Sequence, residues 1–280
     1  MRPVLIALCT LAVAIGVTGS NEGPARWDTG ILWPGNAAEE PGGPARQETA
    51  ARVEVRAAIA AARELRLDDF IAEWKAKVAA EPDSALARFA LAYAYLIHES
   101  PDYIKASAAA GGLWNNIDTA IRLLDKAIEI DPSLGQARLV LGYVYAQFSP
   151  NPVKAIAVLG ELLKREPGNA EAMYWMAKAY GWDTPDERFK HEHCYHPLKR
   201  IQWLESAKAI CPNWLRVRRA LGTAYWAQGW DRTARKWHLD EPWKTKAVAE
   251  YRAVLELARQ QRDASLVERV SRRLAELGAG

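Results

Sequence analysis

The sequence has almost no excess of charge of either sign. Its 37 Lys and Arg residues are set against 34 Asp and Glu residues, which leaves a formal charge of +3 and a sequence pI of about 8.7. The basic side chains are dispersed along the sequence among acidic ones. A nucleic-acid-binding protein needs a concentrated basic surface, so the charge pattern excludes that class.

Strand signals and catalytic motifs are also missing. No alternating run of β-branched residues is bounded by tight turns, and Ala, Leu, Arg and Glu dominate, which favours an all-α protein. No pair of acids, nucleophile triad or phosphate-binding loop stands out. We therefore predict that the protein is not an enzyme and needs no cofactor.

Cysteine is scarce, with three residues in the whole chain. Cys9 lies in the apolar amino-terminal stretch, and Cys194 and Cys211 lie at opposite ends of one predicted helix. About thirteen helical residues put the latter two roughly 20 Å apart, whereas a disulfide needs Cα atoms within about 7 Å. We expect both to remain thiols, with Cys211 buried.

What the sequence does contain is one spaced pattern that occurs four times. Nine, ten and thirteen residues after a proline come a large apolar residue, a small residue and a tyrosine. The four sets are Pro82 with Leu91, Ala92 and Tyr95; Pro132 with Leu141, Gly142 and Tyr145; Pro167 with Met176, Ala177 and Tyr180; and Pro212 with Leu221, Gly222 and Tyr225. A fixed pattern of this kind indicates a repeat architecture.

A second pattern precedes three of these prolines, in the frame A-x3-L-x2-A-x4-P. Its members are Ala120, Leu124 and Ala127; Ala155, Leu159 and Leu162; and Arg200, Leu204 and Ala207. Residues three and four apart lie on one helical face, and the small ones let a neighbouring helix approach closely. The proline then ends the helix.

Helix, turn, helix and proline in this order closely resemble the tetratricopeptide repeat (TPR), whose pattern is W-x2-L-G-x2-Y…A-x3-F…P over about 34 residues. The match is nearly complete from Leu141 to Pro167, and Leu221 to Tyr225 fit it equally well. The repeats depart from the pattern at the tryptophan position, which holds Arg88, Arg138, Met173 and Arg218. The resemblance implies a right-handed superhelical solenoid of antiparallel helix pairs, with about five repeats and a carboxy-terminal capping helix. It also implies a scaffold that binds a partner protein or peptide.

The resemblance further implies that a ligand lies along the concave face formed by the first helix of each pair. The register places ten side chains there: Phe89, Tyr93, Tyr143, Gln147, Tyr174, Lys178, Trp182, Arg216, Arg219 and Trp226. The row is aromatic and gains cations towards its carboxy-terminal end, which suits a peptide with aromatic or aliphatic anchors and an acidic group. The alternative is that some of these aromatic side chains pack between repeats.

The domain that contains the repeats is expected over residues 47–280, with insertions near 97–116, 182–198 and 229–245. The prolines are 50, 35 and 45 residues apart, and the excess over the family unit falls after the tyrosine of a first helix. Tryptophans in these insertions either hold the loops onto the helices or contact a partner. Glycan binding by the loop tryptophans is a further alternative.

The amino-terminal residues 1–19 are typical of a signal peptide, with Arg2 ahead of a short apolar stretch and small residues at a possible cut. We expect an exported protein, periplasmic or otherwise extracytoplasmic, which touches a membrane only through this segment if it stays uncleaved. Residues 20–46 are rich in Pro and Gly and predict a flexible linker. Trp27 and Trp33 in that linker either pack back onto the first helices or form a short docking motif.

One cluster has the chemistry of a metal site. His191, His193, Cys194 and His196 lie together in the string HEHCYH, and three imidazoles on one loop are able to share a zinc or copper ion. The spacing fits no standard zinc or haem motif. The cluster is therefore an alternative site with His191, His193 and His196 as ligands, beside the interpretation as a solvated loop.

Overall fold

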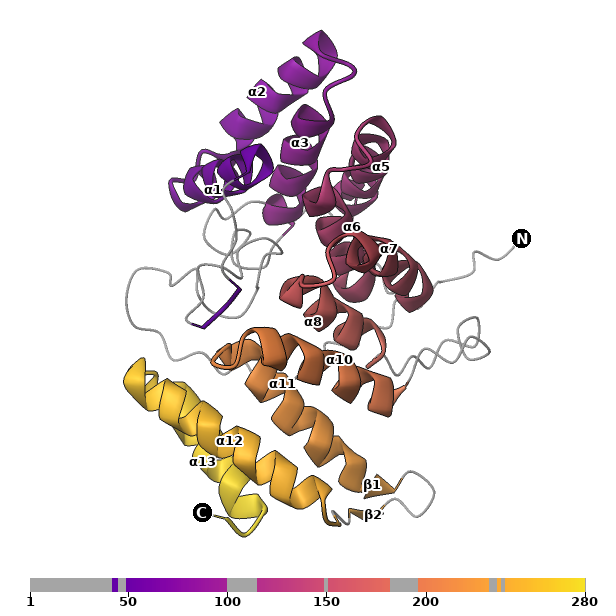
Figure 1. Ribbon diagram of the computed structural model, residues 1–280. Coiled ribbons are helices and arrows are strands. Elements are labelled where there is room, and N and C mark those ends of the chain that lie inside the picture. Colours follow the sequence, from indigo (N-terminus) through magenta and orange to yellow (C-terminus); the bar gives the residue numbers. More distant parts are fainter. Residues whose placement is uncertain are drawn as a thin grey trace, which may run out of the picture.

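The computed structural model describes residues 42–44, 49–99, 115–148, 151–181, 196–231, 236–237 and 240–279. Within these ranges the chain forms eleven α-helices, stacked in sequence order into the all-α solenoid that the repeat pattern predicts (Figure 1). They are α1 (Ala50–Arg63), α2 (Leu67–Ala80), α3 (Ala85–His98), α5 (Asn115–Ile130), α6 (Gly135–Gln147), α7 (Pro152–Arg165), α8 (Ala170–Ala179), α10 (Pro197–Ile210), α11 (Leu215–Trp226), α12 (Trp243–Gln260) and α13 (Ala264–Glu276).

The central helices form four pairs, each with an A helix followed by a B helix. The pairs are α3 with α5, α6 with α7, α8 with α10, and α11 with α12, and each A helix makes its most extensive contacts with its own B helix. Every B helix also packs on the A helix or the cap that follows it. One apolar core therefore runs through all the repeats.

The turn from each B helix to the next A helix is the same in all four repeats. The amide two residues after the proline donates to the carbonyl of the residue before it, from Ser84 to Glu81 (3.0 Å), Leu134 to Asp131 (3.1 Å), Asn169 to Glu166 (3.0 Å) and Trp214 to Cys211 (3.2 Å). Proline is favoured at the second position of such a turn because its φ is already set. The repeated prolines thus end the helices at Ala80, Ile130, Arg165 and Ile210.

Arginine takes over the position of the family tryptophan by holding this turn. The Arg138 guanidinium donates to the carbonyl of Pro132, and that of Arg218 donates to the carbonyl of Pro212. Arg165 of α7 adds a second donor to the Pro132 carbonyl at 2.7 Å. The substitution therefore replaces an apolar contact with a hydrogen bond across the same turn.

The small residue of each repeat is where the two helices of a pair touch. A Cβ atom on Gly142 of α6 would lie 2.5 Å from both Cγ and Cδ2 of Leu159 in α7. A Cβ atom on Gly222 of α11 would lie 2.9 Å from the ring of Tyr251 in α12. Both distances are shorter than carbon atoms tolerate, so glycine sets how closely the helices approach.

A polar network joins the last two pairs. The buried carboxylate of Glu250 in α12 accepts from Lys208 of α10 (2.9 Å) and from Arg218 of α11 (3.0 Å). Lys208 also pairs with Glu205 at 2.7 Å, and Glu205 accepts from the hydroxyl of Tyr225. The Lys208 and Tyr225 bonds lower the pKa of Glu205 against the opposing effect of its burial. The signature tyrosine thus links its own repeat to the preceding one.

The ends of the solenoid differ from its centre, as expected of terminal repeats. Helix α1 contacts α3 more extensively than its sequence neighbour α2, so the first two helices do not form a regular pair. Helix α13 covers α12 and begins at Asp263, whose side chain accepts from the Leu266 amide at 2.8 Å. Helix α13 is thus the carboxy-terminal capping helix expected from the sequence.

The sequence reading missed a small hairpin in the third insertion. Strand β1 (Trp230–Asp231) pairs antiparallel with β2 (Lys236–Trp237), and Trp230 lies opposite Trp237. Two-residue strands are too short to give an alternating pattern, so no sequence signal was available. Helix α12 begins at Trp243, inside the range 229–245 that the sequence predicted as an insertion.

Several predicted features lie outside the described residues. They are the signal segment 1–19, the linker apart from residues 42–44, most of the first two insertions, Trp182, His191, His193 and Cys194. Of the two cysteines beyond the amino-terminal stretch, the structure describes Cys211, which is buried at the carboxyl end of α10, as predicted.

We predict opposite effects of alanine at two helical glycines. Gly142→Ala should lower the free energy of unfolding by about 2 kcal/mol, because the new methyl group overlaps Leu159. Gly160→Ala should raise it by about 1 kcal/mol, because its Cβ would meet only Met176 Cε at 4.0 Å and helix propensity improves. Urea titration followed by circular dichroism measures both. A Gly142→Ala protein as stable as the wild type would contradict the proposed contact.

Candidate protein-binding face

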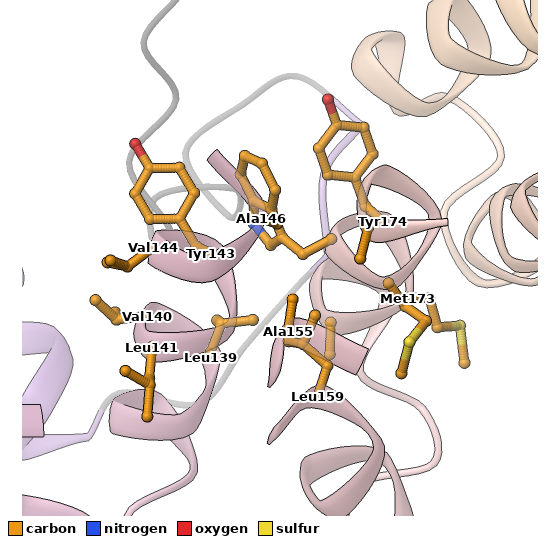
Figure 2. Packing of buried hydrophobic residues seen from close by; sticks show 14 of the residues in the cluster. Leu139, Val140, Leu141, Tyr143, Val144, Ala146, Ala155, Leu159, Met173 and Tyr174 are labelled. Atoms are coloured by element: carbon orange, nitrogen blue, oxygen red, sulfur yellow. The ribbon is translucent and has the colours of Figure 1, made fainter. Parts of the chain in front are cut away.

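The A helices α3, α6, α8 and α11 carry the side chains predicted to face a ligand. Phe89, Tyr93, Tyr143 and Tyr174 lie on these helices, and each is at most 6% exposed. Figure 2 shows Tyr143 and Tyr174 pointing the same way from neighbouring helices, with Leu139, Ala155 and Leu159 packed beneath them. These four aromatic side chains pack in the core of the structure, which is the alternative the sequence left open, and their role as anchors for a partner stays a prediction.

A continuous chain of aromatic rings crosses three repeats. Trp175 of α8 lies edge-on to Tyr143 of α6, with ring centroids 4.6 Å apart, and to Tyr174 at 5.0 Å. Phe148 extends the chain at one end, 5.4 Å from Tyr143, and Trp214 at the other, 5.7 Å from Tyr174. Such contacts add specific geometry to the burial, so they fix how the A helices sit on one another.

Four cationic side chains gather where this chain of rings ends. They are Lys178 of α8, Arg200 of α10, and Arg216 and Arg219 of α11, and we call them the cationic cluster. The Arg216 guanidinium lies 5.3 Å from the centre of the Tyr174 ring and 5.5 Å from that of Trp214. Ring faces stabilise a cation at such distances.

Burial and mutual repulsion shift the ionisation of this cluster. Burial lowers the pKa of Lys178, and the positive charges of Arg200 and Arg219 lower it further. Burial also lowers the pKa of Arg216 well below its ordinary value, with Arg219 adding to the effect. The same burial raises the pKa of Tyr174, which Arg219 and Arg200 partly offset. Burial is the largest cause of all three shifts, and the neighbouring positive charges act in addition to it. An anion beside these cations would favour their charged forms.

The remaining predicted residues that the structure describes differ in their exposure. Gln147 and Arg219 are exposed, Lys178 and Trp226 are partly buried, and Arg216 is 4% exposed. Arg273 of α13 lies over the Trp226 ring, 4.1 Å from its centre. The structure thus brings Tyr174, Lys178, Arg216 and Arg219 together, whereas Phe89 and Tyr93 lie on the more distant helix α3.

Sequence reasoning missed Trp175, Trp214 and Arg200. Trp175 directly follows Tyr174, and a single-face register cannot place two successive residues in one contact. Trp214 follows Pro212 and Asn213 as the residue before α11, and it is fully buried. Arg200 stands where the repeat frame has alanine, and this departure from the pattern is the one signal that marked it in advance.

The structure describes only part of the predicted metal site. Of its predicted ligands the structure describes only His196, which is the N-cap residue of α10 and lies 5.9 Å from the Tyr180 ring. Nowhere in the described ranges do three His, Cys, Asp or Glu residues come together as metal ligands would. None of the described helices has the length and hydropathy to cross a membrane.

Comparison with known proteins identifies the fold. The chain resembles the crystal structure of MamA, with a TM-score of 0.52 at 18% identity over 74% of this chain and 96% of that one. It resembles PilW, described as a widely conserved type IV pilus biogenesis factor, with a TM-score of 0.52 at 13% identity over 81% and 93% of the two chains. The TPR protein TTC0263 of Thermus thermophilus gives 0.51 at 16% identity over 80% and 99%. No family model matches the chain, and no curated protein matches it either.

These neighbours are helical-repeat proteins of the TPR type, so the chain has the TPR solenoid fold, as the sequence predicted. The low identities agree with the divergence of its tryptophan position. They establish the architecture only, and the binding face has to be argued from the side chains of this chain.

We predict that Trp175→Ala lowers the free energy of unfolding by about 3–5 kcal/mol, since it removes a buried ring that contacts two repeats. Trp226→Ala is the control, because this ring is only partly buried and lies at the edge of the core, with Arg273 4.1 Å from its centre. We expect the control to lose about 1 kcal/mol. Chemical denaturation measures both, and equal losses would contradict the packing role of the ring chain.

Proposed function

We propose that this protein is an exported helical-repeat scaffold that binds an acidic segment of a partner protein or peptide. The observation that carries the proposal is the cationic cluster, which gathers Lys178, Arg200, Arg216 and Arg219 from three helices around Tyr174. The TPR-type neighbours support a scaffold with a protein partner, and with it a protein that is not an enzyme.

The proposed mode of binding depends on which side chains of the A-helix face are exposed to solvent. Since the aromatic rings are packed between repeats, a partner meets mainly the charged rim of the A-helix face. Arg219 is exposed and able to form a bidentate pair with a carboxylate, while the less exposed cations strengthen the local field. Binding of this kind is fast, selective for acidic segments and weakened by salt.

Export enters the proposal through residues 1–19. Their short basic start and apolar stretch support secretion, after which the partner would be met outside the cytoplasm. Metal and glycan binding are not carried into the proposal, because no described contact favours either one.

We predict that Arg219→Glu abolishes capture of the partner, because it reverses a charge at the centre of the cluster. The mature chain, immobilised in about 0.1 M salt, is exposed to an extract of the host, and retained proteins are identified by mass spectrometry. Arg122→Glu is the matched control, an equal charge reversal at an exposed arginine of B helix α5.

A protein kept by the wild type and the control and lost with Arg219→Glu supports the proposed face. Its dissociation constant should rise at least tenfold in the variant and should also rise with salt. A partner kept equally by both variants would place binding elsewhere on the solenoid.

We predict that the chain recovered from its host lacks residues 1–19 and is found outside the cytoplasm. Cell fractionation followed by intact-mass measurement tests both points. A replacement of Leu5 and Leu8 by arginine should retain the protein in the cytoplasm, because it disrupts the apolar stretch. Full-length protein in the cytoplasmic fraction of the wild type would contradict export.

A further inference from the structure

A short stretch of the linker lies against the turns of the solenoid, far in sequence from its contacts. Residues 42–44 appear in Figure 1 as a short indigo segment away from α1. Gly42 approaches the turn before α11 so closely that a Cβ atom would overlap the carbonyl of Asn213, and it would lie 2.9 Å from the Trp214 nitrogen. Its φ of +74° also favours glycine.

The contact continues along the same edge of the molecule. Pro44 is buried and lines a cavity of about 540 Å³ together with residues of the turns before α8 and α6, among them Asn169 and Gln136. Gly42 therefore lies at the turn before α11, and Pro44 lies at a cavity bordered by the turns before α8 and α6.

This anchor lies within reach of the cationic cluster for the residues that precede it in the chain. Asn213 is three residues before Arg216, so their Cα atoms are at most about 10 Å apart. Glu40 and Glu39 are two and three residues before Gly42, at most about 7 and 10 Å away along an extended chain. Glu40 precedes a proline, which favours the extended backbone that this reach requires.

The charge and side chains of the linker match what the cluster would bind. Residues 20–41 contain four carboxylates, of Glu22, Asp28, Glu39 and Glu40, against one guanidinium, of Arg26, a net charge of −3. The linker also carries the apolar run Ile31-Leu32-Trp33 ahead of the acidic pair. Acidic groups beside an apolar anchor are the chemistry expected of a ligand for this face.

We propose that the linker segment 20–41 docks on the chain's own cationic cluster through Glu39 and Glu40, and so occupies the face that an acidic partner would use. The docking depends only on contacts within this chain. The competition with a partner rests on the proposed function.

Hydrogen exchange of the mature chain, measured by mass spectrometry with no partner present, tests the docking. In the wild type, the amides of residues 36–40 should exchange at least tenfold more slowly than in a synthetic peptide of the same sequence. Glu39→Lys/Glu40→Lys should remove this protection. Glu22→Lys/Asp28→Lys is the matched control, with the same charge change on the same linker but farther from Gly42, and it should keep the protection.

Exchanging the charges on both sides tests whether the linker carboxylates pair with the cationic cluster or whether the substitutions affect the linker in another way. Combining Glu39→Lys/Glu40→Lys with Lys178→Glu/Arg219→Glu should restore at least part of the protection, and a melting curve of each variant confirms that the solenoid is folded. Equal exchange in the wild type and in Glu39→Lys/Glu40→Lys would overturn the docking, as would an equal loss in the control.

The competition has its own readout. A partner identified by the Arg219-dependent capture should bind the Glu39→Lys/Glu40→Lys chain at least fivefold more tightly than the wild type and the control variant. Equal affinities would overturn the competition, whereas the exchange experiment decides the docking whether or not a partner is found. Failure of the two proposals is therefore distinguishable.

Discussion

The close contact between the two helices of a pair is the constraint on which the rest of this structure depends. Gly142 admits Leu159, and Gly222 admits the ring of Tyr251, so the axes approach closely enough for the flanking side chains to interlock. One pair buries only part of its apolar surface, and stacking on the next pair completes the core. The identical proline turns then set the same entry point for every A helix.

The sequence was sufficient for the parts of the fold that depend on local spacing. The positions of the small residue, the tyrosine and the proline follow from helical periodicity, and they predicted the pairs, their ends and the cap at Asp263. The burial of Tyr143 and Tyr174 could not be predicted in this way. It depends on Trp175 and Trp214, which reach these rings from other repeats. Distances between repeats are set by the superhelix and not by the spacing within one helix.

The arginines at the tryptophan position show how far such a repeat can diverge. Arg138 and Arg218 hold the proline carbonyls by hydrogen bonds, where the family pattern has an apolar ring. The geometry of the turn is the same in all four repeats although the side chain differs. The sequence can therefore diverge from the family pattern while the fold stays the same. This agrees with the 13–18% identity to the structural neighbours and with the lack of a matching family model.

The position of the linker anchor determines how strong a competing partner has to be. In the proposed docking, the contact of Gly42 with the turn before α11 keeps the acidic pair close to Arg216 and Arg219. A short flexible connection gives an attached segment an effective concentration of the order of millimolar. A partner present at about micromolar concentration must then bind roughly a thousandfold more tightly than the linker segment does as a free peptide. Charge alone, screened within about 10 Å at ordinary ionic strength, gives such a partner little advantage over Glu39 and Glu40. The partner therefore needs additional contacts, and the exposed Gln147 is a described side chain of this face that is able to provide one.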